Sequence, residues 1–343
     1  MSETSGSEPR LRVTVNDVAK HAGVSQSTVS QVLGGSRPVA QATRVRVLRS
    51  IEVLGYHPNQ LARALRQQRS QTVAIVVPNI YHELYPAVAR GVSEVLRPLG
   101  YQVALYDTDN VRAIETQVIR SIAERATDGA VIFGYPLSRA DARILTDLGI
   151  ALVNGGLDDE VPHPWDTVRV AQAEAVRDLV ELVGSHYDGP IAYLGGPTDH
   201  PTSAVRKSGF AAGMERLGRS INGDLIATVP QYSFDAAYQV FGELLDTDSH
   251  IRLVICANDL LAIGVMAVAR ERGYRVPDDI AVTGYDNIVA AQMSVPPLTT
   301  VETFPNEQGR TCAKLLLDRM VEGYGGRPRL ITLPTQIINR KSA

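Results

Sequence analysis

Cysteine is nearly absent from this chain of 343 residues, which contains only Cys256 and Cys312, each within an apolar stretch. Two thiols are too few for a disulfide framework or a cysteine-based metal site. They are typical of buried free thiols in a reducing compartment, so we expect a cytoplasmic protein. No run of about 18 apolar residues occurs, so no transmembrane helix and no membrane partner is expected. The first ten residues, MSETSGSEPR, lack the apolar segment of a secretory signal, and residues 1–12 are predicted to be a disordered tail.

Catalytic and nucleotide-binding motifs are also missing. The chain has no Gly-x-Ser-x-Gly elbow, no phosphate-binding Walker loop and no dinucleotide fingerprint. His82-Glu83 lacks the second histidine that a His-Glu-x-x-His zinc motif requires. We therefore expect no enzyme, no catalytic residues, no metal site and no cofactor.

Charge is distributed unevenly along the chain. Residues 1–70 contain ten Lys and Arg against four Asp and Glu, a net charge of +6, whereas the whole chain carries −3, so the remainder carries −9. The length predicts two or three domains. A basic segment on an acidic body is typical of a nucleic-acid-binding module attached to another domain.

Residues 13–34, VTVNDVAKHAGVSQSTVSQVLG, have the pattern of two short helices joined by a tight turn. Asn16 is predicted to cap the first helix and Ser25 the second, and Gly23 ends the first helix where a positive φ is favourable. Gln26 and Gln31 lie on the polar face of the second helix. This layout predicts a helix-turn-helix whose second helix enters the major groove. Two amphipathic helices of an ordinary all-α domain are the alternative.

A third helix is predicted over residues 41–54, with Gly55 ending it. Its apolar side is predicted to be Val45, Leu48, Ile51 and Leu54. Arg44, Arg46 and Arg49 are available to contact phosphates. Residues 59–65 predict a further helix that is too short to be stable alone in water, so it needs a partner surface.

From residue 72 the chain alternates strands and helices. Two series of strands are predicted, at 72–77, 102–106, 129–132 and 151–153, and then at 191–194, 225–229, 253–255 and 280–283. Helices are predicted between them, at 85–99, 114–125, 171–183, 203–217, 234–245 and 260–272. This alternation predicts parallel sheets of βαβ units in two lobes, with a ligand cleft at the carboxyl ends of the strands.

Four stretches, in this order, resemble the lactose-repressor (LacI) family of transcription regulators. They are DVAKHAGVSQSTVSQVL, TRVRVLRSIEVLGYHPNQLARAL, CANDLLAIGVMA, and VPDDIAVTGYDN followed by PPLTTV. The resemblance extends from about residue 13 to residue 341 and implies an all-α head on an α/β body with a two-lobed, periplasmic-binding-protein-like fold and parallel sheets. The implied domains are a helix-turn-helix head (13–57), a hinge helix and linker (58–71), a first lobe (72–167 and 299–326) and a second lobe (168–298 and 327–343).

The resemblance implies a homodimer on a pseudo-palindromic operator. The hinge helices pair, and Leu65 wedges into the minor groove, where apolar side chains unstack a base step; the alternative is a plain linker residue. Gln31 stands where the family usually has Arg. Gln favours adenine, whereas Arg favours guanine. The predicted DNA contacts are Thr14, Val15, Asn16, Ser25, Gln26, Ser27, Thr28, Ser30, Gln31, Arg37, Asn59, Ala62 and Leu65.

The resemblance also implies a ligand site between the lobes. By motif position Arg206 binds the ligand with Asn258 and Asp286, a donor and acceptor set that suits polyols. The predicted ligand residues are Asn79, Tyr81, Tyr85, Asn154, Arg206, Tyr232, Asn258 and Asp286. The alternatives are that Asp286 caps a turn, that Asn258 caps the following helix, and that the tyrosines only pack.

These patterns together predict a sequence-specific, DNA-binding transcriptional regulator, in the first place a repressor. A small polar effector, expected to be a sugar, binds between the lobes and changes operator affinity by allostery. A regulator of the same fold that takes a purine, a nucleoside or another metabolite as corepressor is the alternative. A free sugar-binding protein is disfavoured by the basic head and by the missing signal segment.

Overall fold

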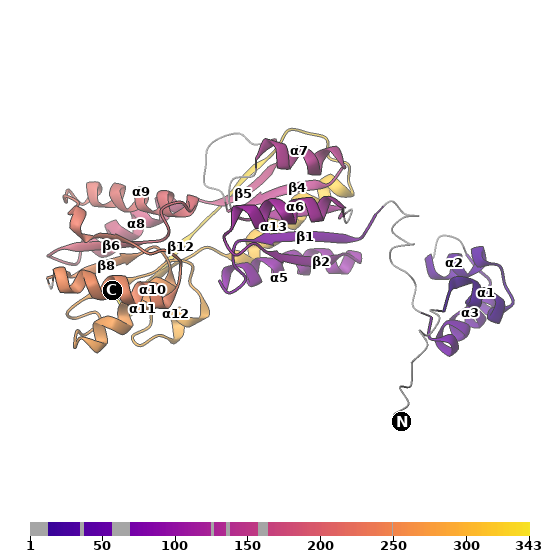
Figure 1. Cartoon of the computed structure of the whole chain (residues 1–343), viewed down its shortest axis with the longest axis horizontal. Helices are drawn as coiled ribbons and strands as arrows, with labels where there is room; N and C mark the ends of the chain where they lie inside the picture. The colour runs from indigo at the N-terminus through magenta and orange to yellow at the C-terminus, as the bar shows by residue number, and fades with distance from the viewer. Residues whose placement is uncertain are drawn as a thin grey trace, which may run out of the picture. The chain divides into compact units, whose positions relative to one another are not determined.

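The computed structural model describes residues 13–34, 38–56, 69–124, 127–134, 138–156, 164–248 and 250–343. The chain divides into two compact units, Met1–Ser70 and Gln71–Ala343 (Figure 1). Within the described residues, no helix is both long enough and apolar enough to cross a membrane. Cys256 and Cys312 are free and buried, which confirms the sequence prediction.

The described part of the first unit contains three helices: α1 (Val15–Ala22), α2 (Gln26–Gly34) and α3 (Gln41–Leu54). Gly23 ends α1 at φ 60°, and its N–H donates to the last carbonyls of the helix. The helices enclose a small core made of Val18, Ala19, Ala22, Val29, Val32 and Val47. The helix-turn-helix prediction is thereby confirmed in its helices and in its turn.

The cap of α1 differs from the prediction. Thr14, not Asn16, is the N-cap: its Oγ1 accepts from the Asp17 N–H at 3.3 Å, and the Asp17 carboxylate accepts from the Thr14 N–H at 2.8 Å. Asn16 lies inside the first turn because the helix already begins at Val15. Ser25 does cap α2 as predicted, since its Oγ accepts from the Thr28 N–H at 3.2 Å.

The buried side of α3 also differs from the prediction. Val47 and Ser50 are buried, whereas Val45 and Leu48 are 55% and 46% exposed. Ile51 and Leu54 pack against the core as predicted, whereas Val47 and Ser50 are buried in place of Val45 and Leu48, because α1 and α2 cover the side that contains Val47. Ser50 satisfies its hydroxyl in this position by bonding to His21 Nδ1 at 3.0 Å and to the Arg46 carbonyl.

The first lobe of the second unit is a six-stranded parallel sheet in the order β11-β5-β4-β3-β1-β2. The strands are β1 (Thr72–Val77), β2 (Gln102–Asp107), β3 (Gly129–Ile132), β4 (Ala151–Gly155), β5 (Asp166–Val170) and β11 (Leu330–Leu333). The helices of this lobe are α5 (Leu84–Leu96), η1 (Arg97–Leu99), α6 (Arg112–Glu124), α7 (Arg139–Asp147) and α13 (Pro305–Met320). Alternate residues of β1 face the α5/α13 side and the α6/α7 side, so both faces of the strand are buried.

The second lobe has a four-stranded parallel sheet in the order β7-β6-β8-β9. Its strands are β6 (Ile191–Gly195), β7 (Ile226–Thr228), β8 (Leu253–Cys256) and β9 (Ala281–Thr283). Its helices are α8 (Gln172–Gly184), α9 (Pro201–Arg216), η2 (Gly223–Leu225), α10 (Phe234–Thr247), α11 (Asp259–Glu271) and α12 (Val289–Met293). Helix α8 packs on α9 and helix α10 packs on α11, and the two pairs lie on opposite faces of the sheet (Figure 1).

The chain crosses between the lobes three times: after β5, between β9 and α13, and after β11 (Figure 1). The antiparallel pair β10 (Thr300–Glu302) and β12 (Gln336–Ile338) belongs to the second and third crossings. The predicted lobe boundary at 167/168 falls inside β5, and the one at 326/327 precedes β11, which pairs with β5. The first lobe therefore includes all of β5, up to Val170, and all of β11, up to Leu333, because these two strands complete its sheet.

Candidate functional site

The predicted recognition surface of the head is the polar side of α2 together with the residues at the start of α1. Gln26 and Ser27 are exposed, and Gln31 is half-buried. The Ser25 hydroxyl bonds to those of Ser27 at 2.7 Å and Thr28 at 2.9 Å, so three predicted contact residues hold one another in place. The predicted contacts within the described part of the head are Thr14, Val15, Asn16, Ser25, Gln26, Ser27, Thr28, Ser30 and Gln31. Arg37, Asn59, Ala62 and Leu65 lie outside the described residues.

A cavity of about 430 Å³ lies between the two lobes of the second unit. Its lining comes from segments that follow the carboxyl ends of strands in both sheets: residues 78–85 after β1, 109–110 after β2, 197–206 after β6 and 230–233 after β7. This is where ligands of parallel α/β sheets bind. Seven predicted ligand residues line the cavity: Asn79, Tyr81, Tyr85, Arg206, Tyr232, Asn258 and Asp286.

Asn154, the eighth predicted ligand residue, is not part of the cavity lining. It lies within β4 and is 1% exposed. Its Oδ1 has no hydrogen-bond partner among the described residues. The glycines that follow it, Gly155 and Gly156, border a small extension of about 40 Å³ next to Tyr85 and Phe133.

Arg206 is held from three directions at the floor of the cavity. Its Nε donates to Gln172 Oε1 at 2.9 Å, its Nη1 to the Ala257 carbonyl at 2.5 Å, and its Nη2 to Asp286 Oδ1 at 3.2 Å. The guanidinium also lies 4.0 Å from the centre of the Tyr285 ring. Burial by itself would lower the pKa of Arg206, but the Asp286 carboxylate raises it above its usual value, so the group stays charged.

Asp286 is the acceptor at the centre of this site. It has a φ of 101°, and its carboxylate lies between Arg206 and His82, whose Nε2 is 3.2 Å from Asp286 Oδ2. Burial would raise the pKa of this carboxyl, but the Arg206 charge and the His82 hydrogen bond hold it below its usual value. The side chain is therefore ionised and faces the cavity, which disfavours the alternative of a turn cap.

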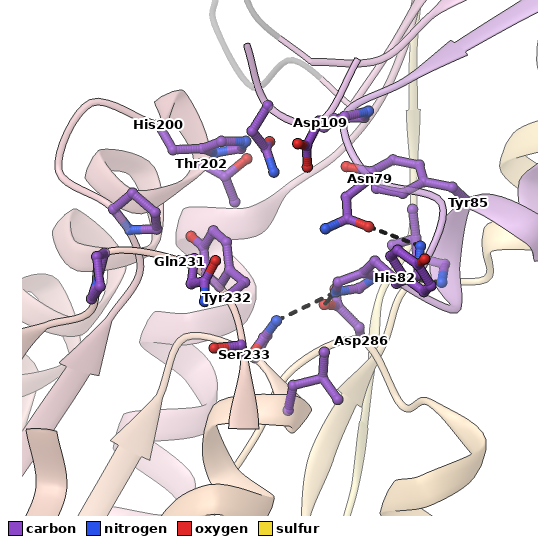
Figure 2. A pocket seen from close by; sticks show the side chains of 18 of the residues that line it. Asn79, His82, Tyr85, Asp109, His200, Thr202, Gln231, Tyr232, Ser233 and Asp286 are labelled. Atoms are coloured by element: carbon purple, nitrogen blue, oxygen red, sulfur yellow. Dashed lines mark hydrogen bonds and ion pairs between the residues drawn. The ribbon is translucent and has the colours of Figure 1, made fainter. Parts of the chain in front are cut away.

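Asn258 does cap a helix, as the alternative proposed, and it also lines the cavity. Its Oδ1 accepts from the Leu261 N–H at 3.0 Å at the start of α11. Its Nδ2 lies 3.3 Å from His82 Nε2. The Asp286 carboxylate and the Asn258 amide thus both lie next to one imidazole. Figure 2 shows His82 and Asp286 beside each other in the cavity.

His82 and Glu83 connect the lobes. Both follow β1 in the first lobe, and Glu83 Oε2 accepts from the Val289 N–H of the second lobe at 2.9 Å. The sequence analysis examined His82-Glu83 only as a failed zinc motif and missed this role. Their position indicated it, because His82 and Glu83 lie five and six residues beyond the end of a parallel strand.

Aromatic and histidine side chains form the walls. Tyr85 contacts the edge of Phe133 with ring centres 5.8 Å apart, while Tyr81 is 88% exposed. Tyr232 bonds through its hydroxyl to Ser203 at 2.8 Å and meets His200 edge-on at 5.7 Å. Burial, with a further contribution from the Arg206 charge, lowers the pKa of His200 to about 4.

One glycine makes room for this wall. A Cβ at Gly196 would lie 2.0 Å from the Tyr232 ring, so only glycine lets the ring occupy its position. Several further cavity residues were missed by the sequence analysis, among them Asp109, Asp199, His200, Thr202 and Gln231. They could have been found because each lies in a segment that follows a predicted strand.

The chemistry of the cavity is hydrogen bonding. Carboxylates, amides, hydroxyls and a guanidinium surround a space bordered by tyrosine rings, which suits a ligand rich in hydroxyl groups. Across the part of the chain that the structure describes, no group of three or more His, Cys, Asp or Glu is placed to hold a metal ion.

Two family descriptions match parts of the chain. Residues 14–59 match the bacterial regulatory proteins of the lacI family, and residues 190–343 match the periplasmic binding protein-like domain. The first region covers the head. The second covers β6 to β12, which is most of the second lobe together with α13 and β11 of the first lobe.

Known relatives extend over the whole chain. The HTH-type transcriptional regulator CelR of Thermobifida fusca is 31% identical over 342 residues, which is 98% of this chain and 99% of CelR. The HTH-type transcriptional repressor CytR of Escherichia coli (strain K12) is 30% identical over 311 residues, 90% of this chain and 89% of CytR. A solved CelR–cellobiose complex matches with a TM-score of 0.73 and 29% identity over 97% of this chain and all of that one. Both relatives are described as transcriptional regulators.

Proposed function

The chain belongs to the LacI family of bacterial regulatory proteins, and from this premise we propose that it works as a homodimeric, sugar-responsive repressor. It is a DNA-binding transcriptional regulator with a helix-turn-helix head and a ligand-binding body. The proposal adds that the effector is a small polyol bound between the lobes and that the operator is a pseudo-palindrome. An operator partner and two buried free thiols support a cytoplasmic location.

The observation that carries the proposal is the buried set of Arg206, Asp286 and Asn258 at the floor of an interlobe cavity. A fixed guanidinium, a carboxylate and an amide offer both donors and acceptors, which neighbouring hydroxyl groups of a sugar can satisfy together. The related CelR structure is described as a complex with cellobiose, which supports a sugar for this chain.

A nucleoside or purine corepressor is the second candidate. It is favoured by the three tyrosines that line the cavity, since Tyr81, Tyr85 and Tyr232 offer ring faces or edges to a planar base. Tyr232 is already held by Ser203 and His200, which leaves Tyr85 and the exposed Tyr81 as the candidates for stacking.

On the DNA side, we propose that α2 reads base edges through Gln26, Ser27, Ser30 and Gln31. Replacing Gln31 by Arg is expected to move the preference at one symmetric base pair from adenine toward guanine, by about 1–3 kcal/mol per half-site. Gel shifts with the full chain on operator variants measure this change. Gln102→Arg adds the same charge at an exposed position of β2 and serves as the matched control.

The same assay measures salt dependence. If each protomer neutralises about three to five phosphates, log K falls with log[salt] with a slope of about −5 to −9. Equal affinity for all DNA sequences, or an affinity that does not change with salt concentration, would contradict the proposed operator binding. An unchanged base preference in the Gln31→Arg variant would show that Gln31 does not contact a base.

A further inference from the structure

We infer that the effector of this chain is a polyol without negative charge, and that phosphorylated and carboxylated sugars are excluded from the cleft. The inference deepens the proposed function and rests on it. It follows from an imbalance in the cavity lining: among the residues that the structure describes, the lining contains three carboxylates, Asp109, Asp199 and Asp286, but only one permanently cationic side chain, Arg206.

The single cation is already engaged. The Arg206 guanidinium donates hydrogen bonds to Gln172, to the Ala257 carbonyl and to Asp286, and its face stacks on the Tyr285 ring. The neighbouring carboxylate balances its charge inside the protein. A phosphate or carboxylate of a ligand would therefore have to compete with Asp286, which is 4% exposed and fixed against the same guanidinium.

The two histidines of the lining do not replace that cation. His82 Nε2 is 3.2 Å from Asp286 Oδ2, so this ring is already paired with a carboxylate of the protein. His200 is neutral at pH 7, because burial lowers its pKa to about 4. Among the described residues of the lining, Asp109, Asp199, Asp286 and Arg206 together carry a formal charge of −2.

The excess charge comes from Asp109 and Asp199, which are contributed by opposite lobes. Asp109 follows β2 and Asp199 follows β6, and both side chains are exposed. Neither forms an ion pair with any residue that the structure describes. Both carboxylates are therefore available to accept hydrogen bonds from a ligand.

Asp109 is held in place by its own turn. Asp109 and Asn110 have φ values of 49° and 56°, the Asp109 N–H donates to Asp107 Oδ1 at 3.0 Å, and the Asn110 N–H donates to the Pro78 carbonyl at 2.7 Å. Figure 2 shows the Asp109 carboxylate among the cavity side chains, with Thr202 and His200 on the other side of the space. Ligand hydroxyls can donate to these two carboxylates from both lobes, whereas an anionic ligand can only be repelled by them.

The test is calorimetric titration of the full chain at pH 7.5 with a sugar panel. Mono- and disaccharides, including glucose and cellobiose, are each supplied as the neutral sugar, the 6-phosphate and the aldonate. We expect that a sugar which binds does so in its neutral form, with its 6-phosphate and aldonate at least about tenfold weaker. The neutral sugar's affinity is expected to be constant between about 50 and about 500 mM salt, while that of the 6-phosphate rises as repulsion is screened.

In the double variant Asp109→Asn/Asp199→Asn, the ratio of the affinity for the neutral sugar to the affinity for its 6-phosphate is expected to fall at least about threefold. Asp147→Asn/Asp188→Asn is the matched control, because it also removes one exposed carboxylate from each lobe, but near the amino ends of β4 and β6, away from the cavity. We expect the control to keep the wild-type ratio of these two affinities.

A 6-phosphate or aldonate that binds as tightly as its neutral partner would overturn the inference, and so would a double variant that discriminates like the wild type. Operator binding without any sugar is measured separately. An anionic effector would therefore refute the charge assignment while leaving the proposed regulator standing, and a chain that binds no operator would refute the regulator instead.

Discussion

At the scale of single residues, the body of this protein fixes protonation states by burial and by neighbouring charge. Arg206 and Asp286 stabilise each other's charged forms, whereas His200 is kept neutral. The three side chains line one cavity, so its hydrogen-bonding pattern is set before a ligand arrives.

His200 makes the stability of the body depend on pH. Its pKa is about 4 in the folded chain against 6.5 ordinarily, so between these values the unfolded chain binds a proton that the folded chain does not. Its contribution is complete above pH 6.5 and is lost as the pH falls toward 4. Urea unfolding can be followed through the single tryptophan, the buried Trp165. Between pH 6.5 and 4, the free energy of unfolding is expected to fall less for His200→Asn than for the wild type.

His250→Asn is the control for removing an imidazole, because that side chain is 87% exposed. We expect its profile to follow the wild type between pH 4 and 6.5. If His200→Asn also followed the wild type there, His200 would not be neutral in the folded chain.

At the scale of elements, the start of α1 depends on the reciprocal bonds between Thr14 and Asp17. Thr14→Ala is expected to destabilise the helix by about 1 kcal/mol, within the usual range of about 0.5–2 kcal/mol for a lost cap. Hydrogen exchange of the peptide covering α1 in the full chain measures this as faster exchange. Asn16→Ala is the control, because Asn16 is the second residue of the helix and does not cap it; this variant is expected to change the exchange rate little.

The element scale also shows what the sequence could reveal. Buried parallel strands such as β1 were predicted at their observed bounds because both faces are covered and the run is continuously apolar. Strands β5 and β11 were missed because polar residues, among them Asp166 and Thr332, interrupt the apolar pattern. The buried side of α3 was mispredicted because the helix carries more than one apolar stripe, and only packing decides between them.

The candidate site was predicted only where motifs named its residues. Arg206, Asn258 and Asp286 came from motif position, and the structure brings them to one cavity. His82, Asp109 and Asp199 were not predicted as site residues, although each follows a strand, because a position after a strand does not by itself show which side chains face the other lobe. Asn154 also came from motif position, but it is 1% exposed within β4 and outside the cavity lining, so its role as a ligand residue stays a prediction.

At the scale of the whole molecule, the lobes form a cleft whose two sides are linked through side chains. His82 contacts Asp286 and Glu83 contacts the backbone of Val289 across the cleft. A ligand that binds Asp286 competes with His82 for the same carboxylate, so it changes the bonds that connect the lobes. Binding then shifts the population of lobe arrangements only as far as the ligand prefers one of them.

The central claim is that a ligand at Arg206 controls operator affinity. The most direct measurement is the operator affinity of the full chain with and without the sugar selected by the calorimetric panel. The wild type is expected to change its affinity by roughly 5–150-fold, which corresponds to about 1–3 kcal/mol of coupling. Arg206→Ala is expected to lose this response and keep operator binding without sugar, with Arg206→Gln as a second, bulkier variant.

Arg216→Ala is the matched control, since Arg216 lies on the same helix α9 but pairs with Glu181 at the surface. The account predicts a full response from Arg216→Ala and none from the Arg206 variants. A full response from both Arg206 variants to the same sugar would contradict it, because the ligand that controls the operator would then bind elsewhere.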